Sequence, residues 1–435
     1  MSERRMIYLC LAHMSEAGME QKYVKEAFDT NWVVPMGPNV NAFEADLANM
    51  ANNVKDTRSE SGMTVNEPLD RKVVCLSAGT AAVHLALIAC GVKAGDEVLV
   101  QSFTFCASSH PITYLGAKPV FIDSERDTWN MDPELLEKAI IERKEATGKY
   151  PKAIIPVALY GMPYDCEKIM AIADKYGIPV IEDAAEGMGS RFNGQVLGTF
   201  GRFGVLSFNG NKMITTSGGG ALICRTPEDA NEIMWYATQA RDAYPYYEHT
   251  AIGYNYRMSN VCAGIGRGQM TVLDDHIAHH KHVQQLYREL LTDIPGVTLH
   301  DQPADPRYDS NFWLCAATLD PDVKIVGQEN AYKEVIKSAV GGAAGVIKAV
   351  DSAVTDCQPN DNVEALRVFM LNKKVECRPV WKPMHKQPVY ADAVAYVNGV
   401  SEEIFKVGFC LPAGPAVTDE DVRYIVECIK EAIVK

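Results

Sequence analysis

Short apolar runs alternate with helical patterns along the first half of the chain. Seven runs rich in β-branched residues predict strands, at 72–77, 97–102, 118–122, 153–159, 178–182, 204–208 and 219–224. Segments of helical period lie between some of them, at 80–90, 132–145, 164–176 and 227–240. The strands are apolar on both faces, which is typical of a mostly parallel sheet covered by helices on both sides. The pattern therefore predicts an α/β fold around a mostly parallel, seven-stranded sheet.

The pattern changes near residue 260. Long helical stretches follow over roughly 259–293, and a mixed α+β tail completes the chain. We therefore expect a large domain over residues 1–260 and a smaller α+β domain over residues 261–435. Two stretches read as insertions, a polar one at 54–72 and one rich in Ala, Gly and Val at 338–354. We detect no internal repeat.

Composition excludes some classes of function. The 435 residues are 47% hydrophobic and carry a net charge of −14, which disfavours broad binding to nucleic acids or anionic membranes. The twelve cysteines are scattered without a CxxC pair, as expected for reduced thiols of a cytoplasmic protein rather than a metal site. The apolar stretch 73–92 is interrupted by Ser77, Gly79 and His84, so we interpret it as a strand, a turn and a helix.

Polar segments follow four of the predicted strands. They are "SAGT" at 77–80, "SFTF" at 102–105, "EDAAE" at 182–186 and "SFNGNK" at 207–212. Ligands of doubly wound sheets bind beyond the carboxyl ends of the strands. The four segments therefore outline one site at one edge of the sheet.

The residue types in these segments indicate particular chemistry. Gly79 and Thr80 open a helix whose free N–H groups could hold a phosphate, although the GxxxxGK[ST] motif of P-loop enzymes is absent. Asp183 could cap the next helix or pair with a protonated ring nitrogen of a cofactor. Lys212 has no charged neighbour close in sequence, so it is either a solvated loop lysine or a lysine that forms a Schiff base with an aldehyde. Ser207, five residues earlier, could hold the phosphate of the same cofactor. A phosphate cup, a carboxylate and a lysine are what pyridoxal phosphate requires.

These residues carry a resemblance to the DegT-type, pyridoxal-phosphate-dependent sugar-nucleotide aminotransferases of fold type I. The resemblance runs from about Leu9 to the C-terminus. The similar segments, in order, are "NWVVPMGPNVNAFE" (31–44), "SAGTAAVHLAL" (77–87), "DEVLVQSFTFCASSHPITYLGAKPVFID" (96–123), "YGMPYDCEKI" (160–169), "IPVIEDAAEGMGS" (178–190), "GTFGRFGVLSFNGNKMITTSGGGAL" (198–222), "GYNYRMSNVCAGIGRGQM" (253–270) and "RPVWKPMHKQPVY" (378–390).

The resemblance implies roles for individual residues. Lys212 would be the Schiff-base lysine and the acid/base, and Asp183 would pair with the pyridinium nitrogen. Glu186 would lie close to the ring and Phe105 would stack on it. The phosphate would be held by Ser207, Thr80 and the amide of Gly79, and by Asn255 of the partner subunit, which makes a homodimer the active unit. Candidates for the nucleotide and sugar are Trp32, Arg241, Arg257, Arg378 and His385.

Simpler interpretations stay open beside these roles. Phe105 could be an ordinary core residue, Arg257 could brace the dimer, and Arg378 and Trp381 could pack around His385. Histidines 84, 110, 276, 279, 280 and 282 read as helix surface or core. Ala78 stands where relatives often have Ser, and the long excursion at 323–362 could reshape the substrate entrance. Relatives that dehydrate sugars carry His in place of the lysine, so Lys212 argues against that chemistry.

The expected substrates are L-glutamate and a nucleotide-linked keto sugar. Within the family, "FNGNKMITTSGGG", "YEHTAIGYNYRMSN" and "CRPVWKPMHKQPVY" are most similar to transaminases of the bacillosamine pathway, which aminate C4 of UDP-2-acetamido-2,6-dideoxy-4-ketohexose. The alternatives are another keto sugar or a keto-cyclitol. A non-catalytic sensor or a structural protein on the same fold would not need the Lys212, Asp183 and Ser207 set.

Overall fold

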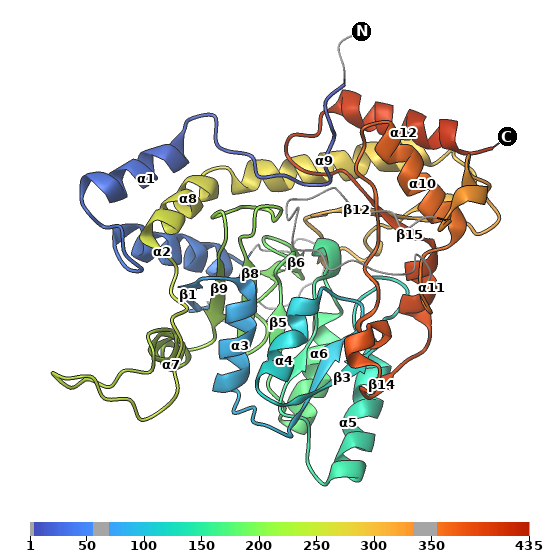
Figure 1. Ribbon diagram of the computed structural model, residues 1–435. Helices are drawn as coiled ribbons and strands as arrows, with labels where there is room; N and C mark the ends of the chain where they lie inside the picture. Colours follow the sequence, from blue (N-terminus) through green and yellow to red (C-terminus); the bar gives the residue numbers. More distant parts are fainter. Residues whose placement is uncertain (1–3, 55–68, 334–354, 435) are drawn as a thin grey trace.

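A central sheet, sandwiched by helices, forms the body of the molecule (Figure 1). The computed structural model describes residues 4–54, 69–333 and 355–434. Across the sheet the strands follow the order β1 (Lys72–Leu76), β9 (Gly220–Cys224), β8 (Phe203–Ser207), β5 (Ile181–Asp183), β4 (Ile154–Ile155), β2 (Glu97–Gln101) and β3 (Lys118–Ile122). Parallel bridges from Ile154 to Val180 and from Val157 to Asp183 join its two halves. Only β9 runs antiparallel to its neighbours, so the predicted α/β fold with a mostly parallel sheet is confirmed.

Successive side chains of each strand belong to different cores, one on each face of the sheet. In β1, Val73 and Cys75 pack in one core, while Val74 and Leu76 pack in the other. Helices α2 (Pro38–Asn52), α5 (Pro133–Thr147) and α6 (Cys166–Tyr176) cover the first face, and α3 (Gly79–Ala89), α4 (His110–Tyr114) and α7 (Pro227–Ala237) cover the second. Because alternate side chains of a strand point to opposite faces, a doubly covered strand must be apolar throughout.

Local signals in the sequence fix the ends of several helices. Asp132 caps α5, because its carboxylate accepts from the amides of Glu134 and Leu135, and Gly148 ends that helix at φ 74°. Asp165 and Gly177 cap α6 in the same way. The predicted continuous stretch 259–293 is two helices, α8 (Asn260–Met270) and α9 (Leu273–Leu291), which are separated at Thr271 and Val272.

A second, antiparallel sheet lies beside the main one. Its strands follow the order β10 (Val297–Leu299), β12 (Cys315–Leu319), β15 (Gly408–Leu411) and β13 (Arg378–Pro379). It shares a separate core with α9, α10 (Asp361–Asn372) and α12 (Asp419–Ala432). Ile7 also belongs to this core, and α9 contributes to both cores. The boundary at residue 260 stays a prediction.

Smaller elements complete the fold. They are α1 (Met19–Asp29), α11 (Val400–Val407), a short sheet of β11 (Tyr308–Asp309), β6 (Arg191–Phe192) and β7 (Gln195–Val196), and β14 (Ala395–Tyr396), which extends the main sheet beside β3. Most of the two predicted insertions lies outside the described residues, at 55–68 and 334–354. None of the helices described is long and apolar enough to cross a membrane. All twelve cysteines are free.

Candidate functional site

The carboxyl ends of β5 and β8 lie close to the start of α3. A Cβ added at Gly79 would come within 3.1 Å of the Ser207 Cβ and 3.3 Å of its Oγ, so the backbone at the start of α3 lies against that hydroxyl. The residue before the helix, Ala78, makes no side-chain cap. The first amides of α3 are therefore free to bind an anion, beside the Ser207 hydroxyl and next to Thr80.

Lys212 lies in the connection between β8 and β9. This connection folds back on itself, because the amides of Phe208 and Thr216 donate to the carbonyls of Gly219 and Phe208. The Phe208 side chain is fully buried and packs 5.2 Å from the ring of Phe43. A rigid, buried turn therefore carries the lysine.

In the structure Lys212 is not isolated from charge, as its sequence neighbours suggested. Its Nζ lies 2.9 Å from Glu186 Oε1, and the two side chains are 12% and 4% exposed. The other oxygen of Glu186 accepts from the Tyr160 amide at 2.8 Å. Burial raises the pKa of Glu186, and the Lys212 charge counteracts this. The partner is 26 residues away in sequence, so only the fold brings this ion pair together.

Asp183 lies at the end of β5, within the electrostatic influence of Lys212. Its Oδ2 accepts from Ser108 Oγ at 2.6 Å, and its Oδ1 accepts from the Ala185 amide at 3.2 Å. Burial raises its pKa, while Ser108 and Lys212 oppose that shift. Two buried carboxylates therefore face one ammonium, which leaves room for a second positive charge.

The neighbouring carboxylate, Glu182, has a structural role. It accepts from the amides of Gly198, Phe200 and Gly201 at 2.6 to 2.9 Å. Successive residues of β5 point to opposite faces, so Glu182 holds a loop while Asp183 faces the site.

Aromatic side chains line the site beside Lys212. The ammonium lies 4.1 Å from the centroid of the Trp313 ring. Trp313, Tyr160 and Trp381 form a cluster: the ring centroid of Tyr160 lies 6.5 Å from that of Trp313 and 5.1 Å from that of Trp381, and the two tryptophan rings are 6.4 Å apart. The ring of Phe105 is 5.6 Å from that of Trp381, and its side chain is otherwise exposed. Phe105 is linked to Lys212 through the rings of Trp381 and Trp313. An exposed aromatic ring in this position is suited to stack on a planar ligand.

His385, a predicted substrate residue, has partners at both ring nitrogens. Nδ1 lies 2.6 Å from Ser102 Oγ, and Nε2 lies 3.1 Å from Glu402 Oε1. Ser102 directly follows β2, so the histidine ties the segment after β13 to the carboxyl edge of the main sheet. This arrangement favours a positioning role.

The other predicted substrate residues are spread over the surface. Arg378 forms an ion pair with Glu376 at 2.6 Å. Trp32 is exposed, and its carbonyl accepts from Asn260 Nδ2 at 2.9 Å.

Three further candidates lie along one segment after α7. Arg241 is exposed, with its guanidinium 4.9 Å from the Tyr247 ring. Asn255 is exposed, and Arg257 bridges to Leu76 at the end of β1. No contact within the described protomer brings Asn255 to Lys212.

Sequence reasoning missed three residues of the site. Ser108 donates to Asp183, Tyr160 donates to Glu186 through its amide, and Trp313 lies beside Lys212. The motif "SFTFCASS" places a serine soon after a strand end, which is a signal for Ser108. Trp313 comes from the smaller sheet's side of the molecule, about a hundred residues after Lys212, and no local pattern predicts it.

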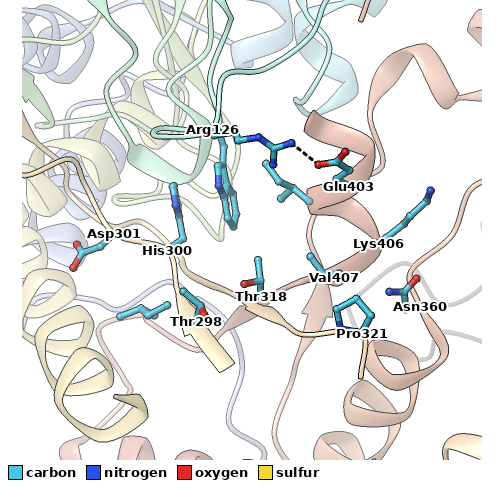
Figure 2. Close-up of a pocket in the computed structure, with 13 residues that line it drawn as sticks. Arg126, Thr298, His300, Asp301, Thr318, Pro321, Asn360, Glu403, Lys406 and Val407 are labelled. Carbon is cyan, nitrogen blue, oxygen red and sulfur yellow. Dashed lines mark hydrogen bonds and ion pairs between the residues drawn. The ribbon is translucent and has the colours of Figure 1, made fainter. Parts of the chain in front are cut away.

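A cavity of about 580 Å³ opens elsewhere in the molecule, between the loop after β3, strands β10 and β12 of the smaller sheet, and helix α11 (Figure 2). Trp129 and His300 stack on one side at 3.7 Å, and Arg126 pairs with Glu403 at 2.6 Å on the rim. None of the residues predicted to bind cofactor or substrate lines it.

The residues around Lys212 fit pyridoxal phosphate. The uncapped start of α3 and the Ser207 hydroxyl can hold a phosphate, and the glycine at 79 keeps that space open. Asp183 can pair with a protonated ring nitrogen, and Lys212 is the amine within reach of Asp183 and Glu186.

Comparison with known proteins gives the same assignment. The sequence profile of the DegT/DnrJ/EryC1/StrS aminotransferase family matches residues 15–343 and 346–430. This chain belongs to that family. The predicted cofactor is confirmed: it is pyridoxal phosphate.

Individual relatives of this aminotransferase cover nearly its whole length. A Bacillus subtilis (strain 168) protein named as a pyridoxal phosphate-dependent aminotransferase, EpsN, is 39% identical over 98% of this chain and 95% of its own. GDP-perosamine synthase of Escherichia coli O157:H7 is 31% identical over 98% and 99%. The fold matches the PLP form of Spr1654 from Streptococcus pneumoniae, described as a sugar aminotransferase, with a TM-score of 0.78, 21% identity and 98% coverage of both chains.

Proposed function

We propose that this aminotransferase moves the amino group of L-glutamate to C4 of a nucleotide-linked 4-keto-6-deoxy sugar. The observation that carries the proposal is the buried ion pair of Lys212 with Glu186, next to the buried carboxylate of Asp183. A lysine placed among carboxylates at the end of a parallel strand can bind an aldehyde and move protons.

Each residue of the site would have a separate role in the reaction. Pyridoxal phosphate supplies an aldehyde for the amine and a ring that withdraws electrons when its nitrogen is protonated. Asp183 keeps that nitrogen protonated, and Ser108 orients the carboxylate. The Nζ of Lys212 takes the proton from Cα of L-glutamate, and in the second half of the reaction it returns a proton to C4 of the sugar. Glu186 holds that Nζ in place between steps.

The amide of Gly79, Ser207 and Thr80 would hold the phosphate, and Phe105 would cover one face of the ring. Phe105 is exposed beside Trp381, so its ring is available for stacking. These walls would also exclude water from the reacting carbon.

We further propose that the acceptor is UDP-2-acetamido-2,6-dideoxy-4-ketohexose. The motifs "YEHTAIGYNYRMSN" and "CRPVWKPMHKQPVY" support this substrate by resemblance. The similarity to GDP-perosamine synthase favours a second candidate, a GDP-linked keto sugar. Trp32, Arg241, Arg257, Arg378 and His385 stay the candidates for contact with, or support of, the nucleotide.

A homodimer with shared sites would complete the enzyme. The segment at 241–252, which follows α7, projects from the body, and its Tyr247 and Ile252 are 78% and 81% exposed (Figure 1). Large apolar side chains that are this exposed in one protomer are typically covered by a partner protein. A second copy would bring Asn255 to the phosphate of the neighbouring site. The free cysteines support a cytoplasmic enzyme.

Incubation with L-glutamate and either keto sugar tests the reaction. Mass spectrometry should detect 2-oxoglutarate and the UDP-linked amino sugar. Product from the GDP-linked sugar alone would overturn the choice of nucleotide, and conversion of neither sugar would overturn the class of acceptor.

Mixing two inactive variants tests the shared site. Lys212→Ala and Asn255→Ala subunits, each impaired alone, should regain activity after subunit exchange, because one site of the hybrid keeps both residues. Failure to regain activity in a hybrid confirmed by native mass spectrometry would contradict sharing.

A further inference from the structure

Two buried histidines of α9 contact the backbone near the site, His276 at the turn that carries Lys212 and His280 at the residue before Trp313. We infer that they are positioning residues, which fix the position of Lys212 relative to Trp313. The inference rests on the proposed function, in which Lys212 is the reactive lysine. Both histidines were expected to be ordinary surface or core residues.

Each ring holds one backbone carbonyl. His276 Nδ1 lies 3.1 Å from the carbonyl oxygen of Met213, and His280 Nδ1 lies 3.1 Å from that of Phe312. A carbonyl oxygen only accepts hydrogen bonds, so each Nδ1 carries the proton and donates it. Burial lowers the pKa of His276 and lowers that of His280 to about 3, so both rings stay neutral in this form.

The two carbonyls belong to the residues next to Lys212 and Trp313 in the chain. Met213 follows Lys212, and Phe312 precedes Trp313. The indole Nε1 of Trp313 donates to the carbonyl of Asn211 at 2.7 Å, on the other side of Lys212. Side-chain N–H groups therefore hold the backbone on both sides of the lysine.

This network joins two segments that are a hundred residues apart. The same helix carries both histidines, one turn apart, so α9 fixes the turn of Lys212 relative to the strand β12 that follows Trp313. The amide side chain of Gln269, from α8, adds a third hold by accepting from the Thr215 amide at 3.3 Å. The lysine ammonium is thereby kept 4.1 Å from the Trp313 ring.

The backbone at Phe312 also calls for support. Its φ is 48°, in the left-handed region that bulky side chains rarely adopt. The carbonyl of Phe312 accepts from His280, and its amide donates to Ser310 Oγ at 3.0 Å. An unfavourable conformation persists only where surrounding contacts hold it.

Substitutions at position 276 separate the donor from the bulk of the ring. In His276→Asn the amide nitrogen lies where Nδ1 was, whereas in His276→Gln it lies one bond further out, and His276→Leu has no donor. The matched control is His282→Leu, an exposed histidine of the same helix that pairs with Asp419 rather than with the Lys212 turn.

The readouts are the visible absorption of the protein loaded with pyridoxal phosphate, as a function of pH, and kcat and KM for L-glutamate. We expect His276→Leu and His276→Gln to shift the spectral titration and to lower kcat about 10- to 100-fold, with KM changed by less than about threefold. His276→Asn should return kcat to within about threefold of the wild type, and His282→Leu should leave both readouts unchanged.

Equal kcat and equal spectra in the Asn and Gln variants, both folded by circular dichroism, would overturn the inference. This comparison holds even if the Leu variant does not fold. A wild-type protein that shows neither a visible band with pyridoxal phosphate nor transamination would instead overturn the proposed function, so the two failures are distinguishable.

Discussion

The Lys212 site and the cavity beside Trp129 both contain a short ion pair, but the two pairs differ in burial. Lys212 and Glu186 are 12% and 4% exposed at 2.9 Å, whereas Arg126 and Glu403 are 65% and 60% exposed at 2.6 Å. Charges attract one another far more strongly where water is excluded, and exposed pairs contribute little.

The comparison shows that the presence of a cavity does not by itself identify the reactive site. The cavity has an open volume of about 580 Å³, yet its charged rim is solvated (Figure 2). At the Lys212 site, three strand-end segments bring two carboxylates, one ammonium and an uncapped helix start together. Matched substitutions at the two places can break or sharpen this contrast.

The largest difference in kcat is expected between variants of two lysines, one at each place. Lys212→Ala should lower kcat by more than about 10³-fold, because it removes the amine that moves the proton. Lys406→Ala, on the cavity wall, should leave kcat unchanged. Steady-state transamination of both variants measures this, and near-normal turnover by Lys212→Ala would remove the lysine from the mechanism.

The next largest difference in kcat is expected between variants of two carboxylates, Asp183 and Glu403. Asp183→Asn should lower kcat about 10²-fold or more, because an amide cannot keep the ring nitrogen protonated, while the fold is retained. Glu403→Gln at the cavity should have no effect. If both variants lost activity equally, the contrast between buried and exposed charge would be wrong.

A smaller effect is expected for Glu186. Glu186→Gln keeps an oxygen for the Tyr160 amide but removes the charge that faces Lys212. We expect about a 10-fold lower kcat and a shifted pH dependence of the visible band. An unchanged spectral titration would show that Glu186 does not act on Lys212.

The smallest effect concerns stability in acid. The pKa of buried His280 is lowered to about 3, so the unfolded chain binds its proton first as the pH falls below the usual histidine range. The free energy of unfolding should therefore fall by up to about 1.4 kcal/mol per pH unit from this group between about pH 6.5 and pH 3.

His280→Asn should flatten that slope, whereas exposed His282→Asn should not. Urea titrations at several pH values measure the free energy of unfolding. Equal slopes in the wild type and His280→Asn would contradict the account of the buried ring.

The sequence was sufficient for the fold, and it predicts the outline of a site. Apolar runs such as 72–77 and 97–102 predict doubly covered strands, and the polar segments after them converge because parallel strands end at one edge. Lys212, Asp183 and Ser207 lie in these segments, and the resemblance to the family supplies the roles predicted for them.

The rest depends on contacts distant in sequence. Trp313 and His276 reach the Lys212 turn only through packing of the smaller sheet and α9. Glu182 and Asp183 are adjacent carboxylates of β5 whose side chains point to opposite faces of the sheet. Glu182 therefore binds the amides of a loop, whereas Asp183 lies in the site. The role proposed for Asn255 depends on a second subunit, which one chain's pattern does not specify.

The most direct test of the central claim compares the visible spectra of the wild type and Lys212→Ala. Both proteins are loaded with pyridoxal phosphate and then mixed with L-glutamate, followed by the UDP-linked keto sugar. We predict that the wild-type band disappears with glutamate and returns with the sugar, while amino sugar accumulates, and that Lys212→Ala completes neither step at a comparable rate. The same cycle in Lys212→Ala would contradict the claim that the buried lysine carries the reaction.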